Sequence, residues 1–104
     1  MMDKVKKIVD CLRRYDPERI ILFGSYAREE ADEYSDVDLV IIKETEERFL
    51  DRIHSALKCW NLPLALDVLV YTPEEFSRML AEENGFILEV MEEGKVIYEK
   101  GPNG

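Results

Sequence analysis

Three aspartates occupy positions where a carboxylate is costly, and their spacing points to metal chemistry. Asp36 and Asp38 open one apolar run, and Asp67 interrupts another. Residues two apart in a strand share a face at about 7 Å, so Asp36 and Asp38 should project side by side. If the strand of Asp67 is a neighbour, three clustered charges need a counter-charge. One or two Mg²⁺ ions, shared with substrate phosphates, would supply it and serve a phosphoryl-type displacement.

Simpler explanations exist for two of these acids. Ser35-Asp36 could form a polar turn at the entry to the strand. Asp67 could be a structural acid paired with a lysine or arginine. Asp38 resists such an explanation because it lies inside the apolar run.

A second set of candidate residues lies at Gly24-Ser25, where an apolar run ends. A strand followed directly by a helix offers free backbone N–H groups to an anion, and glycine allows close approach of a phosphate. Arg28 would fall in the first turn of a helix over 26–33, where a cation opposes the helix dipole, so an anionic partner is expected. The alternative is an ordinary turn in which Ser25 caps the helix.

The apolar periodicity predicts nine elements in the order α-β-α-β-α-β-α-α-β around one mixed sheet, an α/β or α+β fold. The expected strands cover residues 19–23, 36–42, 64–71 and 95–98. The expected helices cover residues 3–15, 26–33 and 45–60, a segment starting with the capping box at 72–75, and a segment over 86–91 after a break at Asn84-Gly85. One domain should span residues 1–100, followed by a frayed tail over 101–104.

Composition narrows the class of protein. The 104 residues are 46% hydrophobic and carry 23 acidic against 14 basic side chains, a net charge of -9, which disfavours direct nucleic-acid binding. No apolar run reaches the roughly 18 residues that cross a bilayer, so we expect no membrane association. Cys11 and Cys59 have neither zinc-like spacing nor the number for a disulfide framework, which favours the cytoplasm. Lone His54 is expected at the surface.

The two sets of candidate residues together resemble the signature of the DNA polymerase β-type nucleotidyltransferase superfamily, and most closely its minimal nucleotidyltransferase members. The resemblance rests on Gly24-Ser25-Tyr26-Ala27-Arg28, on Ser35-Asp36-Val37-Asp38-Leu39 and on the isolated Asp67. It implies a polymerase β-like nucleotidyltransferase fold over nearly the whole chain.

The resemblance also implies roles for individual residues. Gly24 and Ser25, with Arg28, match the nucleotide-binding turn. Asp36 and Asp38 match the pair that holds metal, and Asp67 matches a third acid that completes the metal site and accepts the proton of the attacking hydroxyl. One position departs from the family pattern: the arginine is usually followed by glycine, whereas Glu29 stands here. This departure bears on activity and not on fold.

Two functions follow as expectations. The first is Mg²⁺-dependent transfer of AMP from ATP to a hydroxyl of a partner protein, with the chain acting as antitoxin of a HEPN-type toxin, as the resemblance implies. The second is a weak or inactive module that neutralises the partner by occlusion, which Glu29 favours. A small-molecule transferase is less well supported because so short a chain has little left to build a second pocket wall. A homo-oligomer formed through an edge strand stays open.

Overall fold

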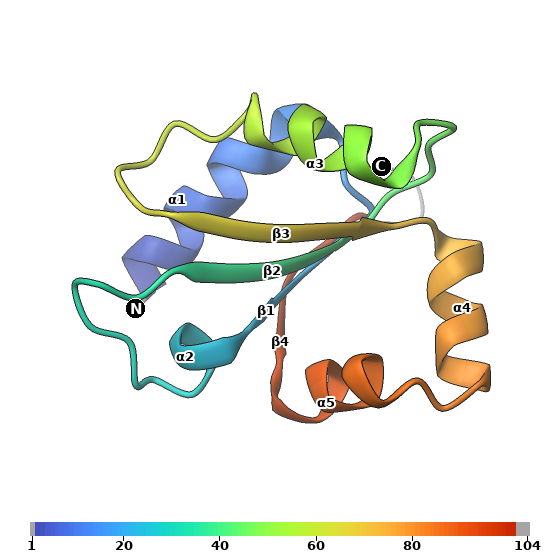
Figure 1. Ribbon diagram of the computed structural model, residues 1–104. Helices are drawn as coiled ribbons and strands as arrows, with labels where there is room; N and C mark the ends of the chain where they lie inside the picture. Colours follow the sequence, from blue (N-terminus) through green and yellow to red (C-terminus); the bar gives the residue numbers. More distant parts are fainter. Residues whose placement is uncertain (1, 102–104) are drawn as a thin grey trace.

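A mixed four-stranded sheet lies at the centre of the molecule (Figure 1). The computed structural model describes residues 2–101, and its strands are arranged in the order β3-β2-β1-β4. β1 pairs antiparallel with β2 and β4, whereas β2 and β3 run parallel. The strands are β1 (Arg19–Phe23), β2 (Val37–Ile42), β3 (Leu66–Tyr71) and β4 (Lys95–Glu99). The single mixed sheet is confirmed, and because most of its strand pairs are antiparallel the domain is α+β.

Helices cover both faces of this sheet. α1 and α3 pack on one face, and α4 and α5 pack on the other (Figure 1). The helices are α1 (Met2–Leu12), continued by the 3-10 turn η1 (Arg13–Tyr15), α2 (Gly24–Ala27), α3 (Phe49–Leu57), α4 (Pro73–Ala81) and α5 (Gly85–Glu93). The predicted element order is therefore correct.

Alternation along β2 divides its side chains between two cores. Leu39 and Ile41 join the core under α1 and α3, while Val40 and Ile42 join the core under α4 and α5. Because side chains two residues apart share a face, Asp38 lies on the α4/α5 side of the sheet, in line with Val40. The apolar run around Asp38 thus reflects a strand buried on both faces.

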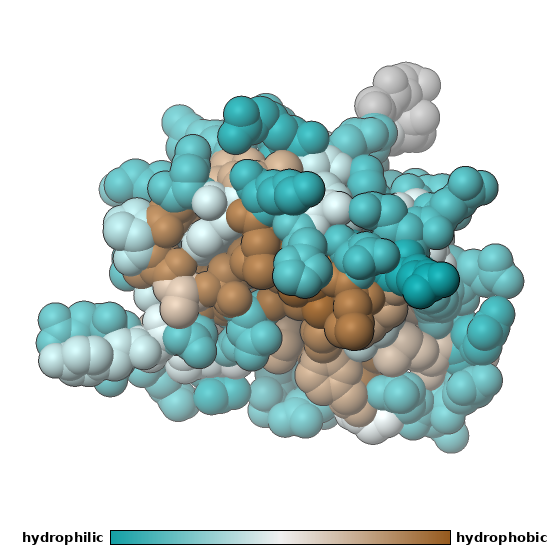
Figure 2. Space-filling model, turned by 45° about the horizontal axis from the view of Figure 1, so that its top comes forward, coloured by the Kyte–Doolittle hydropathy of each residue, from teal (hydrophilic) through white to brown (hydrophobic). Residues whose placement is uncertain are grey.

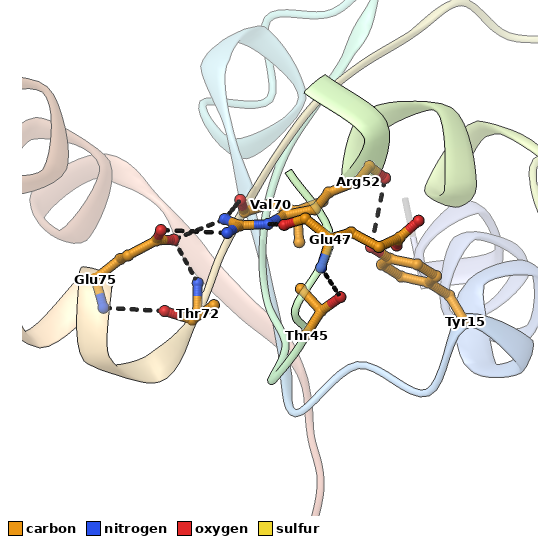
Figure 3. Close-up of polar contacts among 7 residues, drawn as sticks. All are labelled: Tyr15, Thr45, Glu47, Arg52, Val70, Thr72 and Glu75. Atoms are coloured by element: carbon orange, nitrogen blue, oxygen red, sulfur yellow. Dashed lines mark hydrogen bonds and ion pairs between the residues drawn. The ribbon is translucent and has the colours of Figure 1, made fainter. Parts of the chain in front are cut away.

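The buried Arg52 of α3 ties the end of β3 to α4 (Figure 3). Its guanidinium donates to both carboxylate oxygens of Glu75, at 2.7 and 3.2 Å, and to the carbonyls of Val70 and Glu47. Glu75 in turn completes the predicted capping box, since it accepts from the Thr72 N–H while Thr72 Oγ1 accepts from the Glu75 N–H. This network anchors the end of β3 to α3 and α4.

Several predicted boundaries are too wide. The helix expected over 45–60 occupies only Phe49–Leu57, because Thr45 Oγ1 accepts from the Glu47 N–H and holds a turn before it. The strand expected over 64–71 begins at Leu66. The helix expected over 3–15 is α-helical only to Leu12.

The remaining expectations concern the chain ends and the cysteines. Residues 102–104 of the expected tail lie outside the described residues. Cys11 is buried and Cys59 is half-buried, and both are free thiols. His54 is exposed, as expected. Within residues 2–101, no helix has the length and apolar character needed to cross a membrane.

Candidate active site

The register between β2 and β3 brings two of the predicted aspartates together. Asp38 and Asp67 are direct partners across the parallel pair, so both project from the same face of adjacent strands about 5 Å apart. Asp36 stands one residue before β2 and is exposed. All three carboxylates therefore lie at the end of the sheet where β2 and β3 begin.

The three carboxylates act on one another electrostatically. Burial raises the pKa of Asp38, and the negative charges of Asp67 and Asp36 raise it further, while the charge of Arg28 lowers it. The ionised form of Asp38 is thus destabilised by the cluster, because Asp38 is half-buried while its two neighbours are exposed. A cation bound beside Asp38 would relieve this cost.

Asp67 is placed differently from the prediction. We expected it in the middle of a buried strand, but it is the second residue of β3 and is exposed, because β3 is an edge strand. The argument from the cost of burial therefore holds for Asp38 and not for Asp67. None of the ion pairs formed within residues 2–101 involves Asp67, so the simpler explanation by a basic partner has no support in this part of the chain.

Gly24 lies directly against Asp38. Its φ of +71° is in the left-handed region, and it follows Phe23, the β1 partner of Asp38. A Cβ added at Gly24 would overlap the Asp38 Oδ2 atom and would come within 3.0 Å of its Cγ. Only glycine fits here, so the turn and the carboxylate are built as one unit.

The turn after Gly24 is shorter than predicted, and Ser25 does not cap it. α2 is a single turn whose N-cap is Phe23, without a side-chain cap, and Ser25 lies inside the turn. The chain leaves the helix at Glu29, which has a φ of 60°. The loop beyond is held by Asp32, whose carboxylate accepts from the Tyr34 N–H and the Ser35 hydroxyl.

The left-handed conformation at position 29 suits the glycine of the family pattern noted above and not the glutamate that this chain has. Glycine adopts a φ of 60° without steric cost, whereas a residue with a side chain is strained in this conformation. The Glu29 side chain is exposed. Glutamate at this position therefore adds backbone strain beside the turn without entering the core.

Arg28 also differs from the prediction. Because α2 starts at Gly24 and lasts one turn, Arg28 is its C-cap, where a cation agrees with the helix dipole. The argument from a misplaced charge therefore fails, although Arg28 does have anionic partners. The anions that Arg28 does contact are carboxylates: its Nη1 lies 3.5 Å from Glu93 of α5, and its Nε lies 3.5 Å from Glu30.

The donor set suits a hard divalent cation, since all three acids offer oxygen ligands. Among residues 2–101, no three acidic, histidine or cysteine side chains are already gathered closely enough to hold a metal ion. A Mg²⁺ ion shared with substrate phosphates needs only one or two protein carboxylates. Asp38 and its neighbours therefore fit a metal that arrives with a nucleotide.

Sequence reasoning missed α5 as a part of the site. A cavity of about 220 Å³ separates α5 from the end of β1, and Gly24, Arg28 and Glu93 line it together with Phe86. A larger cavity of about 430 Å³ lies at the opposite end of β1, near Arg19, and contains none of the predicted site residues. Gly94, which follows α5 directly, packs closely on β1, because an added Cβ would lie 3.1 Å from the Leu22 carbonyl oxygen.

Comparisons with known proteins agree with this architecture. The family model described as "Polymerase beta, Nucleotidyltransferase" matches residues 6–103. Two curated relatives come from Methanocaldococcus jannaschii. "Putative protein adenylyltransferase MJ1305" is 36% identical over 88 residues, which are 78% of this chain but 58% of that protein. "Putative protein adenylyltransferase MJ0604" is 30% identical over 97 residues, covering 90% of this chain and 94% of that protein.

Two solved structures share the fold. A "putative nucleotidyltransferase from Sulfolobus solfataricus" aligns with a TM-score of 0.62 at 20% identity, over 93% of this chain and 79% of the other. A structure described as "the toxin-antitoxin with AMP-PNP" aligns with a TM-score of 0.53 at 22% identity, over 95% and 76%. At these identities the likeness concerns the fold alone. The match over residues 6–103 and the two relatives establish that the chain belongs to the polymerase β nucleotidyltransferase family.

Proposed function

We propose that this protein is a Mg²⁺-dependent nucleotidyltransferase that transfers AMP from ATP to a hydroxyl group of a partner protein. The observation that carries the proposal is the register of Asp38 with Asp67 beside Gly24. Family membership supports the reaction class, and both curated relatives are named as protein adenylyltransferases. Because the chain spans 58% of one of these relatives, its activity, substrate and partner are all part of the proposal.

In this proposal the nucleotide lies across the ends of β1, β2 and β3. The turn at Gly24 and Ser25 binds the β- and γ-phosphates, where the missing Cβ of Gly24 lets them approach the backbone. Arg28, half exposed at the end of α2, adds a positive charge on that side. Asp36 and Asp38 hold magnesium, which when bound neutralises phosphate charge and the repulsion within the acid cluster.

Asp67 serves as the base. The oxygen of the acceptor hydroxyl attacks the α-phosphorus, the bond from that phosphorus to the bridging oxygen of pyrophosphate breaks, and the hydroxyl proton passes to the Asp67 carboxylate. The exposure of Asp67 at the sheet edge leaves room for an acceptor, whereas the half-buried Asp38 is confined against Gly24. Catalysis then rests on positioning and on neutralisation of charge.

The partner is proposed to be a HEPN-type toxin, with this chain as its antitoxin in the cytoplasm. The solved structure described as a toxin-antitoxin with AMP-PNP shares the fold and supports both a protein partner and a nucleotide. The net charge of -9 favours a basic protein partner over direct binding of nucleic acid, because opposite charges accelerate association.

A second candidate function is neutralisation of the partner by occlusion, with a weak or inactive transferase site. Figure 2 shows apolar side chains gathered in a band over the side of the molecule where α3 and β3 lie. On α3, Leu50 is 69% exposed, and Phe49 and Leu57 are exposed by 36% and 39%. An apolar surface of this kind suits a protein interface. Glu29 favours the same candidate because it strains the backbone beside the turn.

One experiment distinguishes the two functions. The native chain, Asp38→Asn and the control Asp10→Asn, an exposed acid on α1, are each incubated with α-labelled ATP, Mg²⁺ and the product of the adjacent gene. Label on the partner with the native chain and with Asp10→Asn, but not with Asp38→Asn, supports the transferase. A tight complex without label in every case supports occlusion. Calorimetric titration with Mg²⁺ and ATP adds a readout independent of activity, in which Asp38→Asn should weaken metal-dependent binding.

A further inference from the structure

Arg28 is already engaged by two carboxylates. Glu93 of α5 lies 3.5 Å from its Nη1 and Glu30 lies 3.5 Å from its Nε. The Arg28 side chain is 43% exposed, so these contacts are long and open to water. Ion pairs of this kind are weak and exchange readily with other anions.

Glu93 is held in position by the junction between α5 and β4. Gly94 follows it directly, and its N–H donates to the Val90 carbonyl at 2.7 Å. A Cβ at Gly94 would lie 2.9 Å from Ile21 Cγ2, so the junction is packed tightly against β1. The backbone at Glu93 is therefore fixed near the end of β1, next to the turn at Gly24, and the side chains of Glu93 and Arg28 are exposed to a similar degree, 42% and 43%.

The cavity between α5 and this turn gives Arg28 space to change partner. It measures about 220 Å³ and is closed on its apolar side by an edge-to-face contact between Phe23 and Phe86, with ring centroids 5.7 Å apart. Glu89 and Glu93 both line the cavity, but of the two only Glu93 pairs with Arg28 within residues 2–101. Glu89 thus offers a matched control for the general effect of a negative charge.

We propose that Glu93 competes with the terminal phosphate of the nucleotide for Arg28, and so sets the affinity of the site for a triphosphate. This inference rests on the proposed function, in which Arg28 contributes to phosphate binding. In the free protein the guanidinium is paired with Glu93 and Glu30, and on binding it exchanges Glu93 for the phosphate, whose oxygens match its fork of donors better than a carboxylate 3.5 Å away.

Removal of Glu93 should therefore tighten binding. A half-exposed pair of this kind accounts for a change of roughly two- to fivefold in a dissociation constant. Glu89→Gln removes the same charge from the same cavity without releasing Arg28, so its gain should be smaller. The excess of the Glu93 effect over the Glu89 effect measures the competition for Arg28.

The test uses the full chain and inorganic tripolyphosphate with Mg²⁺, titrated by calorimetry at fixed ionic strength. Five proteins are compared: the native chain, Glu93→Gln, Glu89→Gln, Arg28→Gln and the double variant Arg28→Gln with Glu93→Gln. We expect Glu93→Gln to bind two to five times more tightly than the native chain and more tightly than Glu89→Gln, and this gain to vanish in the Arg28→Gln background.

Five outcomes would overturn the inference. Equal gains from Glu93→Gln and Glu89→Gln, or a gain that persists without Arg28, would show that only general charge matters. A weaker affinity of Glu93→Gln would show that Glu93 assists Arg28 instead of competing with the phosphate. If Arg28→Gln binds like the native chain, the role of Arg28 in the proposed function fails together with the inference; if Arg28→Gln binds more weakly while Glu93→Gln changes nothing, the inference alone fails.

Discussion

Gly24→Ala tests whether the turn and the carboxylate of Asp38 form one unit. The added methyl group would overlap Asp38 Oδ2 and would stand 3.3 Å from Asp38 Cβ. Because the backbone of β1 is paired on both sides, the shorter route to relief is rotation of the Asp38 carboxylate away from the turn. The variant should thus displace the central acid of the site while leaving the sheet intact.

The magnitudes separate the effect on stability from the effect on activity. Alanine at a φ of +71° costs about 1–2 kcal/mol, of which about 0.4–1 kcal/mol is regained through the less flexible unfolded chain. The net loss, near 1 kcal/mol, lowers the melting temperature by roughly 4–8 °C. Displacement of a reacting group by about 1 Å costs about 100-fold in rate. We therefore expect transfer of label to fall about 100-fold in a protein that is still folded at 25 °C.

The assay pairs urea unfolding with single-turnover transfer of α-labelled AMP to the partner. Gly85→Ala is the matched control, because Gly85 begins α5 and nothing lies within 4 Å of its added Cβ. That control should keep its activity and gain up to about 1 kcal/mol of stability. If Gly24→Ala retains native activity, the carboxylate does not depend on the turn, and the reasoning about the site is refuted.

Three further predictions concern stability. Arg52→Ala should lower the free energy of unfolding by about 3 kcal/mol, because it leaves the Val70 carbonyl and the Glu75 carboxylate without their donor. Arg52→Lys should recover part of this loss. Equal unfolding curves for the native chain and the two variants would contradict the prediction. The hydrogen bond from Arg52 holds the pKa of Glu75 below its ordinary value, so the stability that the ionised Glu75 contributes is present above that value and is lost as the pH falls through the lower, folded-state pKa. The free energy of unfolding of the native chain should therefore fall more steeply in acid than that of Glu75→Gln. Parallel pH profiles in urea unfolding would argue against this. Glu29→Gly should raise the melting temperature by a few degrees, corresponding to up to about 1 kcal/mol, because glycine adopts a φ of 60° without strain, and an unchanged or lower melting temperature by circular dichroism would count against it.

The sequence was informative wherever a local rule acts alone. Short apolar runs identified four strands, and the Thr72-Pro73-Glu74-Glu75 segment predicted a capping box that is present. The pair Asp36 and Asp38 could be recognised because an acid inside an apolar run is rare. Each of these signals depends on residues close together in the chain.

The sequence was less informative where tertiary contacts decide. Nothing local indicates that the chain becomes left-handed at Glu29, so the helix after Ser25 was predicted too long and Arg28 was assigned to the wrong end. Asp67 was predicted to be buried because its strand is apolar, but burial depends on whether a strand lies at an edge. The contact between Arg28 and Glu93 joins residues 65 positions apart and leaves no periodic trace.

The parallel pair of β2 and β3 also separates the chemistry from the contacts that stabilise the fold. Asp38 and Asp67 lie where these strands begin, whereas Arg52 contacts the Val70 carbonyl near the other end of β3 and Glu75 beyond it. Residues 67 and 72 stand about 16 Å apart along an extended strand, which is more than a Debye length at physiological salt. The repulsion within the acid cluster therefore acts at one end of the sheet, whereas the hydrogen bonds of Arg52 stabilise the other end. Because β3 is an edge strand paired with β2 along its whole length, Asp67 can stay exposed to an acceptor without loosening the core beneath it.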